Sequence, residues 1–429
     1  MPVPFNNYPE PMPDLLDYRT PEFEAALAAL PPTPASGLAT DENYWHAVRG
    51  LYRQSDELIN LENGFWGAMA EPVKAMFQHW TERVNRETTL LIRRHYMPLH
   101  DGLRERVAAA IGCAAEEIEL TRNATEALLA LISGYNRLSP GDTVLYSDLD
   151  YPCCKDAMEW LRERRGVTPV RIAIPEPATH ERVIETYAEA LRAHPRTRLL
   201  LLSHVCFATG LVMPVADLSA MAKDAGADVI VDAAHSWGQL DFDVPHLNAP
   251  FTALNLHKWI GAPLGCGAIY IRRGHVASID PYLGDRTWPA DDIRARVHTG
   301  SPNFAAWFTV PAALDAHRRI GAHAKEARLR ALRDAWAEPA RVIEGVQILT
   351  PDDPAMSAGI TAFRLKGHTT KAACDAIVAA LRERFGVFTV ARTGPDAGDV
   401  VRVTPGVFSR MEDAKRLLEG IASLARESK

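Results

Sequence analysis

A lysine and an aspartate that lie 26 residues apart are the side chains with the clearest chemical meaning in this sequence. Lys258 stands between two apolar, β-capable runs in FTALNLHKWIGAPLGCGAIYIRR, residues 251–273. Asp232 ends another apolar run, ADVIVD. Ligands of open α/β sheets bind at the carboxyl ends of the strands. The sequence therefore predicts that Asp232 and Lys258 face one crevice.

Pyridoxal 5'-phosphate (PLP) is the cofactor whose chemistry needs such a pair. A lysine forms a Schiff base with the cofactor aldehyde, and an aspartate keeps the pyridine nitrogen protonated so that the ring accepts electrons from the substrate Cα. The lysine must lose its proton before it attacks, and burial and neighbouring cations favour that loss. A lysine in an isolated His-Lys pair is more often simply solvated, so this interpretation depends on Asp232.

The composition is that of an ordinary globular protein with more than one core. The chain has 429 residues, of which 47% are hydrophobic and 24% are charged. The net charge of −7 comes without a basic block, so no nucleic-acid partner is expected. We expect no membrane span, secretion signal or metal site. The six cysteines show no CxxC spacing and indicate a reducing, cytoplasmic setting.

Alternating strands and helices between residues 117 and 273 predict an α/β fold with a mostly parallel sheet covered on both faces. Polar side chains follow several of these strands: Tyr151, Ser203, His204, Asp232, His235, Asn255 and His257. Because carboxyl ends of parallel strands share one edge, these side chains are expected to meet.

Two further stretches allow both a functional and a structural interpretation. Asn123, Ala124 and Thr125 stand at a helix N-terminus, which either binds phosphate or is a plain N-cap. INLENGFWGAM, residues 59–69, is either a loop shaped around a ligand or a packed turn.

Three regions are predicted around this core. Residues 1–58 form an N-terminal arm, with a linker-like stretch at 31–37, and a helix that packs on the small domain. Residues 59–310 form the cofactor-binding large domain, which includes long amphipathic helices at 71–95 and 98–112. Residues 311–429 form a smaller α+β domain ordered strand, helix, strand, strand, helix.

Eight segments resemble the class V aminotransferases, a family of fold-type I PLP enzymes, and within it the isopenicillin N epimerase-like branch. They are INLENGFWG, TRNATEALL, SDLDYP, SHVCFATGLVMPV, VDAAHSWGQL, NLHKW, TGSPNF and VRVT, in family order over residues 55–410. The resemblance implies a mostly parallel seven-stranded sheet in the large domain, a smaller C-terminal α+β domain, and a homodimer.

The resemblance assigns five residues to the cofactor ring. Lys258 would form the Schiff base and carry the proton at the substrate Cα. Asp232 would pair with the pyridine nitrogen, and His235 would donate to the phenolic oxygen. Ala234 would pack on one face of the ring, and Tyr151 would stack on the other.

The resemblance also implies contacts to the cofactor phosphate. Ala124, through its backbone, and Thr125 would bind it from the helix N-terminus. Asn255 and His257 would complete the phosphate site. Ser301, in TGSPNF, would reach the phosphate of the other subunit.

Two arginines are candidates for the substrate. Arg402 matches the family arginine that grips the α-carboxylate, whereas Arg392 is either a second substrate group or a solvated strand end. In the related cysteine desulfurases a loop near this point carries the sulfur-accepting cysteine, but residues 392–397 contain none. Phe207 stands where the desulfurases have an asparagine, which predicts a more apolar pocket.

The predicted activity is a reaction at the Cα of a small amino-acid or peptide-like substrate, as in an aminotransferase or an isopenicillin N epimerase-like enzyme. β-Elimination, which would make the protein a C–S lyase, is the alternative. The missing loop cysteine disfavours a cysteine desulfurase. A non-catalytic regulator is also disfavoured, since residues 1–54 are too rich in proline and acidic residues for a helix-turn-helix.

Overall fold

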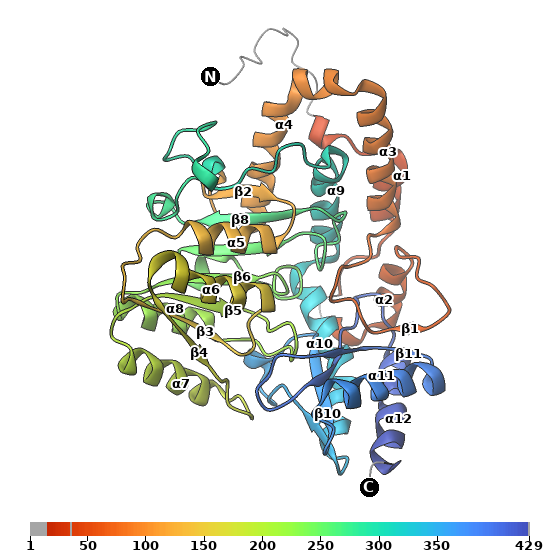
Figure 1. Cartoon of the computed structure of the whole chain (residues 1–429). Coiled ribbons are helices and arrows are strands. Elements are labelled where there is room, and N and C mark those ends of the chain that lie inside the picture. Colours follow the sequence, from red (N-terminus) through yellow and green to blue (C-terminus); the bar gives the residue numbers. More distant parts are fainter. Residues whose placement is uncertain (1–14, 35–36, 428–429) are drawn as a thin grey trace.

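The computed structural model describes residues 15–34 and 37–427, and its centre is a seven-stranded sheet (Figure 1). Its strand order is β2 (Ile118–Thr121), β8 (Gly267–Ile271), β7 (Phe251–Asn255), β6 (Asp228–Ala233), β5 (Thr197–Ser203), β3 (Thr143–Ser147) and β4 (Thr168–Ile172). Neighbours from β7 to β4 are parallel, and β8 is antiparallel to both of its neighbours. The predicted α/β fold with a mostly parallel sheet of seven strands is confirmed.

The central strands are apolar because both faces of the sheet are covered. Along β5, Leu199 and Leu201 belong to the cluster that contains α5 (Ala124–Gly134) and α6 (Pro152–Arg165). Leu200 and Leu202 belong to the opposite cluster, which contains α7 (His180–Ala193) and α8 (Val215–Asp224). Successive side chains of a strand point to opposite faces, so the run TRLLLLS supplies both cores.

Four long helices extend the second of these clusters. They are α3 (Glu71–Glu87), α4 (Thr89–Ala110), α9 (Phe304–Ile320) and α10 (Ala322–Arg341). The predicted break between residues 95 and 98 is wrong, because the chain turns at Thr88, whose φ is 48°. Pro98 lies inside α4. A proline usually ends a helix at the preceding residue, but α4 continues through Pro98.

The C-terminal region forms the expected smaller α+β unit. Its antiparallel sheet has the order β12 (Val390–Arg392), β13 (Val400–Val403), β10 (Thr361–Leu365) and β9 (Val346–Ile348), of which β9 was not predicted. Helices α11 (Lys371–Phe385) and α12 (Met411–Glu427) accompany the sheet. The second predicted strand of this region, VFTVAR at residues 387–392, divides in two. Its first part, β11 (Val387–Phe388), pairs with β1 (Ile59–Asn60), and only β12 joins the larger sheet.

The N-terminal segment contacts both parts of the molecule. Helix α1 (Pro21–Ala28), which was not predicted, packs on α3. Helix α2 (Glu42–Arg49) reaches α10 through an ion pair between Glu42 and Arg328. The predicted boundary after residue 310 falls inside α9, and β1 pairs with the C-terminal region. The domain boundaries therefore stay predictions, and residues 35 and 36 of the proposed linker lie outside the described residues.

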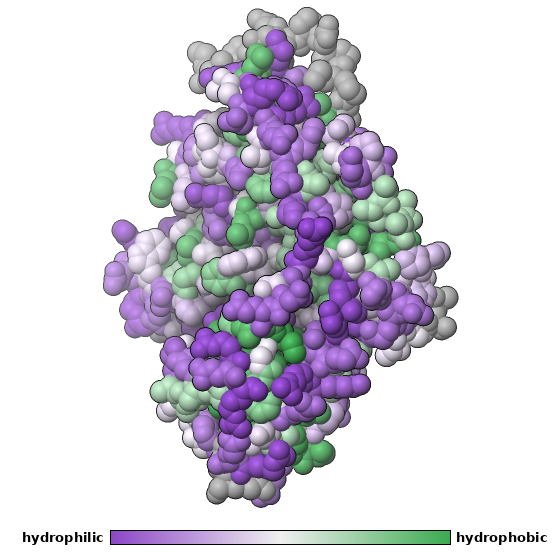
Figure 2. Space-filling view, turned by 90° about the vertical axis from the view of Figure 1, so that its right-hand side faces the viewer, coloured by the Kyte–Doolittle hydropathy of each residue, from purple (hydrophilic) through white to green (hydrophobic). Residues whose placement is uncertain are grey.

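The face that carries α1, α3 and the loop after β1 shows hydrophobic residues in separate patches among hydrophilic ones (Figure 2). Two of the exposed aromatic side chains belong to that loop: Phe65 and Trp66 are 66% and 51% exposed. None of the described helices is long and apolar enough to cross a membrane.

Candidate active site

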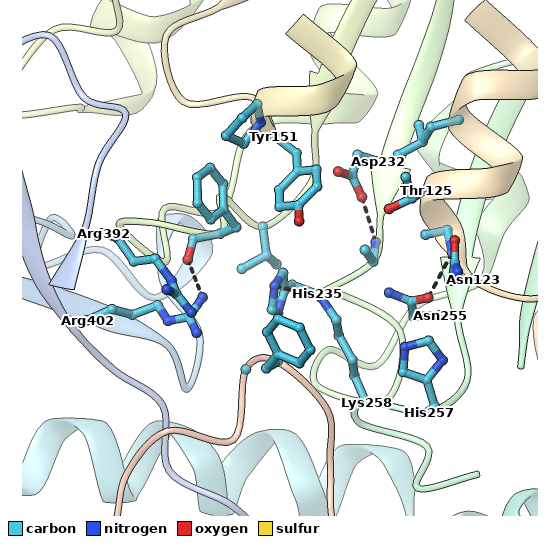
Figure 3. A pocket seen from close by; sticks show the side chains of 18 of the residues that line it. Asn123, Thr125, Tyr151, Asp232, His235, Asn255, His257, Lys258, Arg392 and Arg402 are labelled. Atoms are coloured by element: carbon cyan, nitrogen blue, oxygen red, sulfur yellow. Dashed lines mark hydrogen bonds between the residues drawn. The ribbon is translucent and has the colours of Figure 1, made fainter. Parts of the chain in front are cut away.

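A cavity of about 560 Å³ lies at the carboxyl ends of the central strands, and its other wall includes residues of β12 and β13 (Figure 3). Among the described residues that line it are all the predicted site residues except Ser301: Ala124, Thr125, Tyr151, Asp232, Ala234, His235, Asn255, His257, Lys258, Arg392 and Arg402. Ser301 is exposed just before α9 and does not line the cavity. Side chains far apart in the sequence thus meet at the sheet edge that the strand pattern predicted.

Lys258 is buried at this edge next to His235. Its Nζ lies 2.9 Å from Nε2 of His235, and burial lowers the pKa of Lys258 to about 7. The carboxylate of Asp232 opposes this shift, and the guanidinium of Arg402 adds to it. Burial, with the nearby charge of Lys258, also holds the pKa of His235 well below its usual value. Near neutral pH much of the Lys258 amine is therefore unprotonated and nucleophilic.

Asp232 stands at the end of β6, where Oδ1 accepts a hydrogen bond of 2.9 Å from the backbone N–H of Ala234. Burial raises the pKa of this carboxyl group, so a cationic partner would stabilise its ionised form. Behind it lies Asp150, which the sequence analysis missed. Asp150 accepts hydrogen bonds from the backbone N–H and the hydroxyl of Ser203, and burial raises its pKa to about 6.

Helix α5 begins at Ala124 and points its N-terminus into the cavity (Figure 3). Asn123 caps it, accepting a hydrogen bond of 2.8 Å from the N–H of Glu126. The N–H of Ala124 already donates to Oδ1 of Asn255 at 2.8 Å, so its predicted phosphate contact stays a prediction. The N-cap interpretation of this helix end is confirmed. Thr125 lines the cavity as well, so the phosphate-binding interpretation stays a prediction.

His257 is oriented by its backbone surroundings. Its Nδ1 lies 2.9 Å from the carbonyl oxygen of Cys266, and an oxygen of this kind accepts. Nδ1 therefore carries the proton in the neutral ring, and Nε2 can donate only when the ring is protonated. Burial lowers the pKa of His257, so a bound anion would have to supply the charge that keeps the imidazolium form.

The loop at residues 64–67 passes between the lysine and the arginines. The N–H of Gly67 donates to the carbonyl oxygen of His257 at 2.9 Å, and a Cβ at Gly67 would lie 1.9 Å from the carbonyl oxygen of Lys258. A Cβ at Gly64 would lie 2.6 Å from Nη2 of Arg402. Glycine therefore allows a close approach of the chain at both positions. Gly64 and Phe65 also line the cavity, so the ligand-loop and the packed-turn interpretations of INLENGFWGAM both stay predictions.

Both candidate arginines reach the cavity from the C-terminal sheet. Arg402 is 2% exposed, and its Nη1 donates to the carbonyl oxygen of Phe207 at 2.8 Å. Glu62, a residue that the sequence analysis did not single out, accepts hydrogen bonds from Arg402 at 2.5 and 2.8 Å and from Arg392 at 3.2 Å. The only sequence signal for Glu62 is a carboxylate in the glycine-rich loop that carries the resemblance.

Two aromatic rings form part of the remaining wall. Tyr151, the N-cap residue of α6, meets Phe207 edge to face, with ring centroids 5.3 Å apart.

Among the described residues that line the cavity there is no cysteine. No group of three or more His, Cys, Asp or Glu side chains in the described part of the chain could hold a metal ion.

The donor set fits PLP. An unprotonated lysine, a buried carboxylate and a helix N-terminus match the aldehyde, the ring nitrogen and the phosphate, respectively. Nδ1 of His235 is buried and has no hydrogen-bond partner among the described residues, so it can serve a polar group of the cofactor.

The sheet and the C-terminal unit have the architecture of the fold-type I PLP enzymes. The profile of the class V aminotransferases matches residues 69–416, so the chain belongs to this family. Isopenicillin N epimerase from Streptomyces clavuligerus is 27% identical over 399 residues, which cover 89% of this chain and 99% of that protein. A cysteine desulfurase from Pectobacterium atrosepticum is 28% identical over 349 residues, covering 76% of this chain and 82% of that one.

The fold is also that of solved structures. A mutant of the enzyme C-DES, with glycine covalently linked to its PLP cofactor, has a TM-score of 0.76 at 22% identity, covering 87% of this chain and 98% of that one. A second structure describes C-DES as a cystine C–S lyase, with a TM-score of 0.74 at 22% identity, covering 86% of this chain and 98% of that one. The predicted cofactor is thus confirmed at the level of the family.

Proposed function

We propose that this protein is a PLP-dependent enzyme that transforms an amino-acid or peptide-like substrate at its Cα, as an aminotransferase or an isopenicillin N epimerase-like enzyme does. The main support is Lys258, a buried lysine with a pKa of about 7, in one cavity with Asp232 and two arginines. The similarity to an isopenicillin N epimerase over nearly the full length of both chains supports the branch.

The residues of this chain divide the work between them. Lys258 would bind the cofactor aldehyde, and its Nζ would take the Cα proton of the substrate. Asp232 would balance the charge of the ring nitrogen, and Tyr151 and Ala234 would contact the ring. Bound PLP supplies an electron sink for the carbanion left at Cα. Thr125, Asn255 and His257 hold the phosphate apart from the reacting atoms.

The substrate carboxylate is assigned to Arg392 and Arg402. By fixing the carboxylate, the two arginines would orient the substrate and so select which bond at Cα is broken. Aliphatic and aromatic side chains, among them Val205, Phe207 and Leu264, make part of the wall apolar. This wall favours a substrate larger and more apolar than cysteine.

β-Elimination from a thiol-bearing substrate is the second candidate. The cavity lining contains no cysteine among the described residues, so a sulfur-accepting thiol is not available in it, but a C–S lyase needs none. The likeness to C-DES concerns the fold, and the choice between the two reactions rests on product analysis.

The experiment is product analysis in heavy water with a panel of amino acids, with and without a keto-acid acceptor. Deuterium at an inverted Cα identifies an epimerase, and turnover that requires the keto acid identifies an aminotransferase. Pyruvate with a released thiol identifies a lyase. A protein that takes up no PLP, or Lys258→Ala protein that still turns over every substrate at the wild-type rate, refutes the proposal.

We also propose a homodimer in which Ser301 reaches the phosphate of the partner subunit. Ser301 is exposed and outside the cavity of its own chain, and exposed Phe65 and Leu264 line the cavity mouth, where a second subunit would cover them. Mixing Lys258→Ala chains with Ser301→Tyr chains should give heterodimers with one complete site. An active monomer in light scattering contradicts this assembly. The cytoplasmic location stays a prediction.

A further inference from the structure

Glu62 joins the two arginines of the cavity into one unit. Its Oε1 accepts from Nη2 of Arg402 at 2.5 Å and from Nη2 of Arg392 at 3.2 Å, and its Oε2 lies 2.8 Å from Nη2 of Arg402. The side chains of Glu62 and Arg402 are 8% and 2% exposed. Glu62 is not among the described residues that line the cavity, whereas both arginines are. The carboxylate thus acts on the arginines from outside the substrate space.

The backbone fixes Glu62 in this position. Its N–H donates to the Asn60 side chain at 2.9 Å, and the residue forms a parallel bridge with Thr404, two positions after Arg402. The N–H of Thr404 donates to the carbonyl oxygen of Leu61 at 2.8 Å. The close approach of Gly64 to Arg402 packs the following turn against the same guanidinium. Backbone hydrogen bonds therefore tie the segment of Glu62 to the chain that directly follows the strand of Arg402.

Glu62, Arg392 and Arg402 together carry a net charge of +1. Two guanidinium groups carry two positive charges and the Glu62 carboxylate carries one negative charge, which leaves a net charge of +1. Two neighbouring guanidinium groups would repel each other without it in a buried, weakly screened place. One net charge matches a single carboxylate, whereas a dianionic group would leave an uncompensated negative charge.

We propose that Glu62 is a positioning and specificity-determining residue, which couples Arg392 and Arg402 into one clamp that prefers a monoanionic carboxylate to a dianionic group. This inference rests on the proposed function, in which the two arginines bind the substrate carboxylate. Glu62 sets their orientation from behind and limits their combined charge. The clamp therefore selects for the amino-acid carboxylate and against an aminophosphonate.

The test measures equilibrium binding to the holoenzyme, with calorimetry and the visible spectrum as the two readouts. The probes are norleucine, its phosphonate analogue 1-aminopentylphosphonate, and norleucinamide, which has no acidic group. In Glu62→Gln protein we expect the ratio of phosphonate to norleucine affinity to rise by roughly tenfold, because the clamp gains a positive charge. Glu62→Asp should keep the wild-type ratio but bind both anions more weakly, because the carboxylate no longer reaches both arginines.

The chain contains a matched control. Glu176 pairs with the buried guanidinium of Arg364 through both of its oxygens, at 2.5 and 3.0 Å, and neither residue lines the cavity. Glu176→Gln breaks a comparable buried ion pair and should leave the ratio unchanged. An unchanged ratio in Glu62→Gln, or the same change in Glu176→Gln, overturns the inference.

Arg392→Gln covers the case in which Glu62→Gln protein does not fold. Arg392 is only partly buried, and without it Glu62 and Arg402 form a pair of zero net charge. Norleucine should then bind hardly better than norleucinamide. A retained preference for norleucine overturns the inference. Wild-type protein that binds none of the three amines contradicts the proposed function itself, which separates the two failures.

Discussion

The low pKa of Lys258 can be measured directly, because the reactivity of an amine follows its neutral fraction. A pKa of about 7 leaves roughly three quarters of the Lys258 amine neutral at pH 7.5. At that pH, only roughly one in a thousand amines of a lysine with the ordinary pKa of 10.5 would be neutral. We therefore expect Lys258 in the cofactor-free protein to have a neutral fraction several hundred times that of an ordinary lysine.

Competitive acylation measures this difference residue by residue. The cofactor-free protein is acylated with trace reagent between pH 5 and pH 11, and the label on each lysine peptide is quantified by mass spectrometry. Labelling of Lys258 should be half-maximal near pH 7, and exposed Lys415 provides an internal reference. Lys258→Ala protein identifies the peptide that carries the signal.

Two variants test the electrostatic cause of the low Lys258 pKa by the direction in which they move the labelling midpoint. The Asp232 carboxylate raises the pKa of Lys258 and the Arg402 guanidinium lowers it. Asp232→Asn should therefore move the midpoint of Lys258 labelling below that of the wild type, and Arg402→Gln should move it above. A general loosening of the structure would move both midpoints toward 10.5. A wild-type midpoint near 10, or shifts of the same sign in the two variants, would refute the electrostatic reasoning.

Three further predictions concern neighbouring groups. Buried Lys325 donates to the carbonyl oxygen of Trp259, and burial lowers its pKa to about 7, below its value in the unfolded chain. Its contribution to the free energy of unfolding therefore rises with pH from about 7 to about 10.5. In denaturant titrations, Lys325→Met should remove roughly 2 kcal/mol of the increase in unfolding free energy between pH 7 and pH 9. Gly67→Ala forces a Cβ onto the Lys258 carbonyl oxygen and should cost roughly 1–3 kcal/mol in the same titrations, with weaker retention of PLP; wild-type stability would contradict the close contact. Arg402→Lys should lower kcat/KM by roughly 10–100-fold for amino acids but little for their amides, because lysine lacks the bidentate fork; equal losses on both would exclude the carboxylate contact.

The sheet and the cavity edge were predictable because each depends on local sequence patterns. Apolar runs followed by polar side chains mark strand ends, and parallel strands bring those ends together. The strand pattern alone assigns Asp232, Asn255 and His257 to this edge, and all three line the cavity. The helix break at Thr88 was not predictable, because its positive φ belongs to a residue type that rarely adopts it.

The pairing of Glu62 with the arginines could not be predicted from local sequence patterns. It requires β1 to lie beside β11, and the chain segment after β1 beside the end of β13, and both are contacts between residues more than 300 positions apart. A local pattern carries no information on such a contact, so the arginines were assigned without their counter-charge. The combined charge of the two arginines is nevertheless set by this contact. The resemblance to the family identifies Arg402 as the arginine that binds the carboxylate. The pairing with Glu62 in the folded chain decides the combined charge that Arg392 and Arg402 present.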